Sequence, residues 1–247
     1  EKRISELNRE LKVMEKDRET QRKRRKESEL PSVALVGYTN AGKSTLMNKM
    51  LDIWMGDTEK KVLEKDMLFA TLETSVRNIP LPDNKEFLLT DTVGFVSKLP
   101  HHLVKAFRST LEEVVEADLL IHVVDFSNPN YEQQIEITDQ TLNDIGIKEI
   151  PTIFAYNKAD LTEIDIPQVN RDSVYMSVKN KVGIQELIDQ IRGHVFVDYI
   201  RCEMLIPYDQ GQLVSYFNEH GHITETEYDE NGSKLKLECK KTDYEKY

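Results

Sequence analysis

A glycine-rich run near the start of the chain matches the pattern G-x-x-x-x-G-K-[ST] at every fixed position. The run consists of Gly37, Tyr38, Thr39, Asn40, Ala41, Gly42, Lys43 and Ser44. A loop binds polyphosphates only if several backbone N–H groups point inward, and glycines permit that curvature. In this pattern the lysine reaches the outer phosphates and the serine hydroxyl takes a Mg²⁺ position. The run therefore predicts a phosphate site between a buried strand and a helix that begins near Lys43.

From residue 30 to about residue 198, strand-like and helix-like segments alternate. Strands are predicted at 32–36, 74–79, 87–90, 119–125, 152–156 and 174–177, and helices at 43–51, 101–117, 131–144 and 184–192. Alternation of this kind predicts an α/β fold with a doubly wound, mostly parallel sheet. Ligands of such folds bind at the carboxyl ends of the strands.

The two ends of the chain have a different character. Residues 1–29 are highly charged and carry an apolar seam at three- and four-residue steps, formed by Ile4, Leu7, Leu11 and Met14. This spacing predicts one arm of a long helical linker or hairpin, and we expect the chain to be a fragment that begins inside it. Residues 195–247 are predicted to form a small β-α-β-β domain of the α+β type. The predicted domains are thus 1–29, 30–194 and 195–247.

The charge balance limits the classes of partner. The formal net charge is −11, which excludes a generally basic nucleic-acid binder. The one dense basic run, at residues 22–26, is either a solvated helix end or an RNA contact. Cys202 and Cys239 show no metal spacing, and we expect reduced thiols in the cytosol. The sequence contains no apolar run as long as a membrane span.

Three further motifs follow the phosphate loop in the order that a guanine-nucleotide site requires. The first, Asp91, Thr92, Val93 and Gly94, places a carboxylate for Mg²⁺ and a glycine N–H for a γ-phosphate; the second consists of Asn157, Lys158, Ala159 and Asp160. The Asp160 carboxylate can accept both N1–H and the 2-amino group of guanine, whereas adenine offers neither donor. The third motif is Ser177, Val178 and Lys179, whose backbone is expected to meet guanine O6. Together the motifs predict a P-loop GTPase that converts GTP to GDP and phosphate.

The threonine that binds Mg²⁺ in the triphosphate state is harder to place. Thr71 and Thr74 both lie in the segment after the phosphate-loop helix, and we choose Thr71 because Thr74 is expected to enter the next strand. The expected metal ligands are therefore Ser44, Thr71 and Asp91. The neighbouring residues expected at the nucleotide are Phe69, Ala70, Leu72 and Glu73.

The motifs together resemble those of the HflX family of translational GTPases. The resemblance rests on the phosphate loop through Thr45, on the run 68–72, on Asp91 to Phe95 followed by Leu99 and Pro100, and on the run 103–113. It implies a preceding N-terminal globular domain that is not in this sequence. It also implies binding to the large ribosomal subunit and GTP-dependent splitting or rescue of stalled ribosomes, in some members under heat stress or antibiotic exposure. We expect a monomer with no membrane partner.

The hydrolysis step departs from the commonest pattern. Many GTPases carry a water-orienting glutamine after the glycine of the second motif, whereas this chain has Phe95, which we expect to pack the switch. We predict slow intrinsic hydrolysis that a partner accelerates, with Lys43, Asn40 and Gly94 as the catalytic groups. Asn40 resembles the potassium-coordinating asparagine of cation-activated GTPases; the alternative is that it only stabilises the loop.

The motifs are also compatible with two other functions. One is a GTP-gated ribosome-assembly or binding factor in which hydrolysis only times release. The other is a cation-activated GTPase of transfer-RNA modification or iron transport. The latter is disfavoured because the chain shows no membrane span for transport and lacks the C-terminal helical element of the modification family.

Overall fold

The computed structural model describes residues 30–54, 75–95, 114–147 and 149–247. The described residues from Ser32 onward belong to one compact unit. The predicted helical arm 1–29, with its seam and its basic run, lies outside the described residues, as does most of the helix predicted at 101–117.

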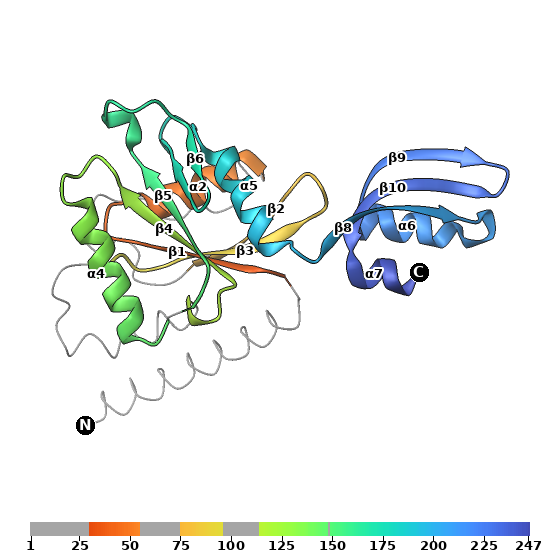
Figure 1. Cartoon of the computed structure of the whole chain (residues 1–247), viewed down its shortest axis with the longest axis horizontal. Coiled ribbons are helices and arrows are strands. Elements are labelled where there is room, and N and C mark those ends of the chain that lie inside the picture. Colours follow the sequence, from red (N-terminus) through yellow and green to blue (C-terminus); the bar gives the residue numbers. More distant parts are fainter. Residues whose placement is uncertain (1–29, 55–74, 96–113, 148) are drawn as a thin grey trace, which may run out of the picture. The chain divides into compact units, whose positions relative to one another are not determined.

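A seven-stranded sheet forms the centre of the larger part of this unit (Figure 1). The strands follow the order β2-β3-β1-β4-β5-β7-β6. Their bounds are β1 (Ser32–Val36), β2 (Ser75–Pro80), β3 (Glu86–Asp91), β4 (Leu119–Asp125), β5 (Thr152–Asn157), β6 (Gln168–Asn170) and β7 (Ser173–Tyr175). The five inner strands pair in parallel, and β2 and β6 pair antiparallel at the two edges. The predicted α/β class with a mostly parallel sheet is confirmed.

Helices cover both faces of this sheet because its inner strands are apolar on both sides. On one face, α2 (Lys43–Trp54) and α5 (Ile184–Val195) pack against β1, β4 and β5; on the other, α4 (Tyr131–Asp144) packs through Leu142 near Ala34 and Val36. The sequence of α5 explains how such a helix packs on the sheet. Its buried residues recur at three- and four-residue steps and so form one apolar face, at Ile184, Leu187, Ile188 and Ile191.

The parallel register brings the carboxyl ends of four strands to one edge of the sheet. Leu35 in β1 lies opposite both Asp91 at the end of β3 and Ile121 in β4, and Asp125 at the end of β4 lies opposite Asn157 at the end of β5. The predicted motif residues that follow these strands are therefore neighbours in space.

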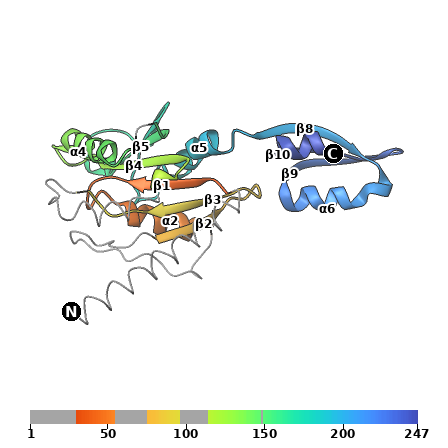
Figure 2. The ribbon, with the colours of Figure 1, turned by 90° about the horizontal axis from the view of Figure 1, so that it is seen from below.

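A second, three-stranded antiparallel sheet forms near the C-terminus, in the order β8-β10-β9. Its elements are β8 (Tyr199–Ile206), the 3₁₀ turn η3 (Tyr208–Gln210), α6 (Gly211–His220), β9 (His222–Asp229), β10 (Gly232–Lys240) and α7 (Lys241–Lys246). The α6 helix runs along one face of this sheet (Figure 2), where Phe217 packs against Leu235 and Leu237. The strands and the longer helix of this region follow the order β-α-β-β, and α7 comes after them.

The turn between β2 and β3 contacts this second sheet and its helix. The Asn84 side-chain amide donates to the Asn218 carbonyl at 2.9 Å and the Gly221 carbonyl at 2.8 Å, and so caps the C-terminal end of α6. The neighbouring Lys85 ammonium is buried, 2.9 Å from a Glu238 carboxylate oxygen in β10. The turn therefore ties the second sheet to the strand that ends in Asp91.

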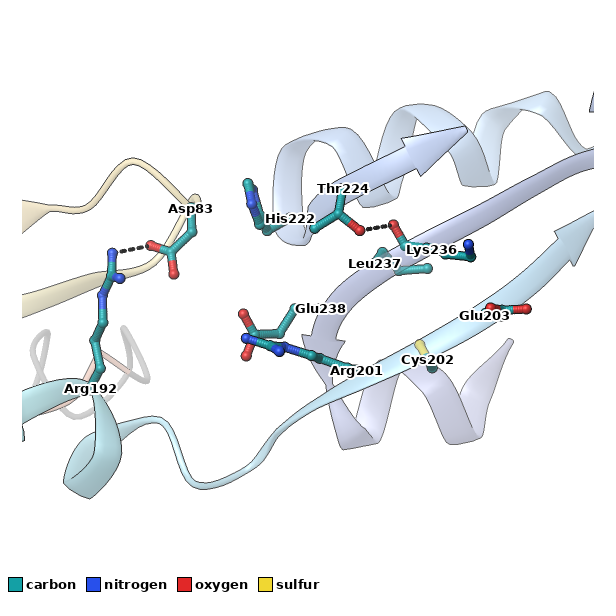
Figure 3. A pocket seen from close by; sticks show the side chains of 10 residues that line it. All are labelled: Asp83, Arg192, Arg201, Cys202, Glu203, His222, Thr224, Lys236, Leu237 and Glu238. Atoms are coloured by element: carbon teal, nitrogen blue, oxygen red, sulfur yellow. Dashed lines mark hydrogen bonds and ion pairs between the residues drawn. The ribbon is translucent and has the colours of Figure 1, made fainter. Parts of the chain in front are cut away.

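A cavity of about 690 Å³ lies beside this turn (Figure 3). Acidic and basic side chains line it in near balance: Asp83, Glu203 and Glu238 with Arg192, Arg201 and Lys236. Arg192 reaches across from α5 and donates to Asp83 at 3.1 Å. Among the described residues, the predicted nucleotide-site residues do not line this cavity.

None of the helices in the described part of the chain is both long enough and apolar enough to cross a bilayer.

Candidate functional site: the nucleotide-binding edge

The phosphate loop joins β1 to α2 and depends on unusual backbone angles. Gly37 has φ 140° and Gly42 has φ 104°, both in a region that favours glycine, and Asn40 has φ 61°. A Cβ on Gly37 would lie 2.2 Å from the Val123 carbonyl oxygen of β4. The two motif glycines are therefore required by backbone angle and by space.

The Lys43 side chain is buried and folds back into the phosphate loop. Its ammonium donates to the Gly37 carbonyl at 2.9 Å and to the Tyr38 carbonyl at 3.0 Å. Burial lowers the pKa of Lys43 to about 8, and the nearby Asp91 carboxylate partly opposes that shift. A bound phosphate would supply the further negative charge that favours the ammonium form.

Ser44 and Asp91, two of the three predicted metal ligands, lie together. The Ser44 hydroxyl donates to an Asp91 carboxylate oxygen at 2.6 Å, and Asp91 is fully buried. A hydroxyl and a carboxylate are hard oxygen donors of the kind that Mg²⁺ prefers, so the pair fits the metal. The third predicted ligand, Thr71, lies outside the described residues, as do Phe69, Ala70, Leu72 and Glu73.

The segment after β3 pairs with the phosphate loop. The Phe95 N–H donates to the Gly37 carbonyl at 3.1 Å, and the Thr39 N–H donates to the Phe95 carbonyl at 2.9 Å. A Cβ on Gly94 would lie 2.7 Å from the Thr39 side chain and 3.1 Å from the Lys43 ammonium nitrogen. Gly94 is therefore next to the predicted position of the outer phosphates, as its motif requires.

The remaining residues of this segment have structural contacts. The Thr92 hydroxyl donates to the Leu35 carbonyl at 2.6 Å, and Val93 is buried. The Phe95 ring is fully buried in a cluster that includes Val36 and Val114. A phenylalanine ring in this place cannot orient an attacking water by hydrogen bonding.

The Asn157 side chain joins the phosphate loop to the loop that contains Val178. Its side-chain amide donates to the Ala41 carbonyl at 2.9 Å, and its side-chain oxygen accepts the Val178 N–H at 3.0 Å. Asn157 is only 4% exposed, so both bonds form away from water. The predicted bracing role of this asparagine therefore has a geometric basis.

Lys158 connects the second motif to the phosphate loop. Its backbone is left-handed, with φ 61°, and its ammonium donates to the Asn40 carbonyl at 2.9 Å. The same ammonium lies 2.7 Å from an Asp125 carboxylate oxygen, and the other Asp125 oxygen accepts the Ser127 hydroxyl at 2.6 Å. Asp125 was not predicted as a site residue, although its position at the end of β4 was a signal.

Asp160 lies beside the loop that runs from Ser177 to Val182, which we call the Ser177 loop. The Ala159 N–H donates to the Met176 carbonyl at 3.1 Å, and the Asn180 side-chain amide donates to an Asp160 carboxylate oxygen at 3.2 Å. The predicted Lys179 side chain is exposed, and Thr45 is half-buried in the first turn of α2. The structure thus brings the phosphate and base motifs together on one edge.

Comparison with known proteins identifies the family. The family model described as the 50S ribosome-binding GTPase matches residues 32–158, about half of the chain. This chain belongs to that GTPase family. The matched residues include the phosphate loop, the Asp91 motif and the first two residues of the Asn157 motif.

Two curated relatives extend the likeness over almost the whole chain. The GTPase HflX of Caldanaerobacter subterraneus subsp. tengcongensis is 44% identical over 236 residues, which cover 96% of this chain and 53% of the relative. The GTPase HflX of Escherichia coli is 37% identical over 237 residues, which cover 94% of this chain and 54% of the relative. The predicted resemblance to the HflX family is confirmed, and the chain spans about half the length of these relatives.

Solved structures support the fold. A GTP-binding protein from Sulfolobus solfataricus, solved in complex with GDP, aligns with a TM-score of 0.53 over 77% of this chain and 60% of that protein. At 23% identity the likeness shows the shared fold alone.

Proposed function

We propose that this chain is the GTP-binding and GTP-hydrolysing part of a protein that binds the large ribosomal subunit and splits or rescues stalled ribosomes. The GTPase part is supported by one observation: Lys43, the Ser44–Asp91 pair and Asn157 lie together at the carboxyl ends of the parallel strands. The ribosomal part is supported by the family description and by the relatives called GTPase HflX. The cytoplasm is the proposed location, with stress or antibiotic exposure as the setting.

The proposed division of labour follows the predicted boundaries. We propose residues 1–29 as a helical arm, residues 30–194 as the GTPase domain and residues 195–247 as a small C-terminal domain. In its support, β8 begins a sheet that is separate from the seven-stranded one. The protein is proposed to act as a monomer.

The chain's own residues would divide the chemistry as follows. Ser44, Asp91 and Thr71 would hold Mg²⁺, which neutralises phosphate charge when bound. Lys43 and the backbone of the phosphate loop would bind and orient the outer phosphates, and the Gly94 N–H would meet the γ-phosphate. Asp160 would read the guanine edge, with Lys158 along the base. Because Phe95 cannot position water, the ribosome would order the switch segments and so accelerate hydrolysis.

The test measures GTP turnover by the full-length protein with and without purified large ribosomal subunits. We expect stimulation of about a hundredfold or more, the scale of a missing transition-state contact. Sucrose-gradient separation of joined ribosomes would show whether subunits part. Binding to immature particles only, without splitting, would instead support the alternative of an assembly factor in which hydrolysis times release.

Potassium near Asn40 is a further part of this proposal. Asn40 is exposed on the phosphate loop, so its side-chain oxygen is accessible to a cation, and its backbone carbonyl accepts from the Lys158 ammonium. A monovalent cation there would supply positive charge to the developing transition state. We expect GTP turnover to be about tenfold faster in potassium than in sodium buffer, and Asn40→Ala to abolish the difference. Equal rates in the two buffers would contradict the potassium site and leave Asn40 as a loop-stabilising residue.

A further inference from the structure

Asn180 lies outside the nucleotide motifs but is held in place beside one of them. Its backbone N–H donates to the Ser177 hydroxyl at 3.2 Å. Two backbone hydrogen bonds of 3.0 Å between Ser177 and Val182 close the loop that contains it. The next residue, Lys181, has a left-handed backbone with φ 58°. A short loop closed in this way gives Asn180 a defined direction.

The direction of the Asn180 side chain is toward Asp160. Its amide nitrogen lies 3.2 Å from one Asp160 carboxylate oxygen. The opposite side of the same loop is fixed by Asn157, which accepts the Val178 N–H. Asp160 and the loop from Ser177 to Val182 are both expected to recognise the edge of guanine, and Asn180 links them.

We infer that Asn180 is a positioning residue for base specificity, acting through the Asp160 carboxylate. The inference rests on the proposed guanine site. Asp160 can grip N1–H and the 2-amino group together only if both carboxylate oxygens lie in the plane of the base. A carboxyl group on a half-exposed turn otherwise rotates about its last bond, which is a broad, weakly defined torsion. The Asn180 amide, which donates to one Asp160 oxygen, restricts that rotation. The second lone pair of the same oxygen can still accept a hydrogen bond from the base.

The chemistry of the base provides the test. GDP presents both N1–H and the 2-amino group, whereas inosine diphosphate lacks the 2-amino group and needs only one carboxylate oxygen. Loss of the Asn180 donor should therefore weaken GDP more than inosine diphosphate. If Asn180 instead only maintained the fold of the loop, both nucleotides would weaken equally.

The experiment measures dissociation constants of GDP and inosine diphosphate by displacement of a fluorescent GDP analogue from this chain with Mg²⁺. For Asn180→Ala we expect about a fivefold weaker GDP complex, the scale of one ordinary net hydrogen bond, and less than about a twofold change for inosine diphosphate. Asn180→Asp, which is nearly isosteric but places a carboxylate against Asp160, should weaken GDP more than Asn180→Ala, and added salt should reduce that excess.

Matched controls separate the possible failures. Asn143→Ala removes another exposed asparagine, whose amide donates to the Asp139 carbonyl within α4, and should change neither constant. Equal losses for the two nucleotides, or no loss, in Asn180→Ala would overturn the positioning role. Failure of the wild-type chain to prefer GDP over ADP would instead overturn the proposed guanine site.

Discussion

Gly37→Ala is expected to abolish measurable GDP binding and to destabilise the fold. The backbone of Gly37, with φ 140°, is costly for any residue with a Cβ, by about 1–3 kcal/mol. The new methyl group would also lie 2.2 Å from the Val123 carbonyl oxygen, which belongs to the backbone of a central strand and cannot move aside. We expect the free energy of unfolding to fall by about 3 kcal/mol or more. Denaturant unfolding and GDP titration measure the two effects.

Two other glycines separate strain from steric overlap. Gly146 also has a left-handed backbone, with φ 94°, but a Cβ there would meet nothing within 4 Å. Gly146→Ala should therefore cost only the strain, about 1 kcal/mol. Gly193 lies inside α5 with open space around it, so Gly193→Ala should stabilise the chain by about 0.5–1 kcal/mol. A Gly37→Ala variant that is no less stable than Gly146→Ala would contradict the steric argument.

The bounds of several elements that pack in the core could be predicted because burial of a strand or of one helix face leaves a pattern in the sequence. The predicted strands at 32–36 and 119–125 and the helix at 131–144 coincide with β1, β4 and α4. In β4 all residues except the last are buried, so a run of apolar residues interrupted only by His122 identifies it.

The elements that were missed carry no such pattern. All three residues of β6 are exposed, and the strand pairs only with β7 at the edge of the sheet. The α7 helix has no buried residue and consists mostly of polar and charged residues. Tertiary context rather than apolar periodicity determines both elements.

The candidate site shows the same division. The glycine, lysine and aspartate motifs were predicted because their spacing is fixed along the chain. The Asp125–Lys158 pair and the Asn180–Asp160 contact were not, because each depends on how separate loops meet. The Asn84 cap of α6 joins residues 134 positions apart, a distance at which single-sequence patterns carry no signal.

The second large effect is expected for Asn157→Ala. This substitution should break the link between the phosphate loop and the loop that contains Val178. Truncation leaves the Ala41 carbonyl and the Val178 N–H without their buried partner, and each lost partner costs about 1–3 kcal/mol. We expect the free energy of unfolding to fall by about 3 kcal/mol and GDP affinity to fall by about a hundredfold. Thermal unfolding with and without GDP, together with GDP titration, measures both.

Gly42→Ala provides a second route to the same loss, because a Cβ on Gly42 would lie 2.4 Å from the Asn157 side-chain nitrogen. That nitrogen belongs to a buried amide held by two hydrogen bonds, so it cannot move aside without breaking them. In the Asn157→Ala background the overlap disappears, and Gly42→Ala should then cost only the strain of its φ of 104°. The double variant should therefore be more stable than the sum of the single losses predicts. Strictly additive losses would contradict the overlap between the new methyl group at Gly42 and the Asn157 side chain.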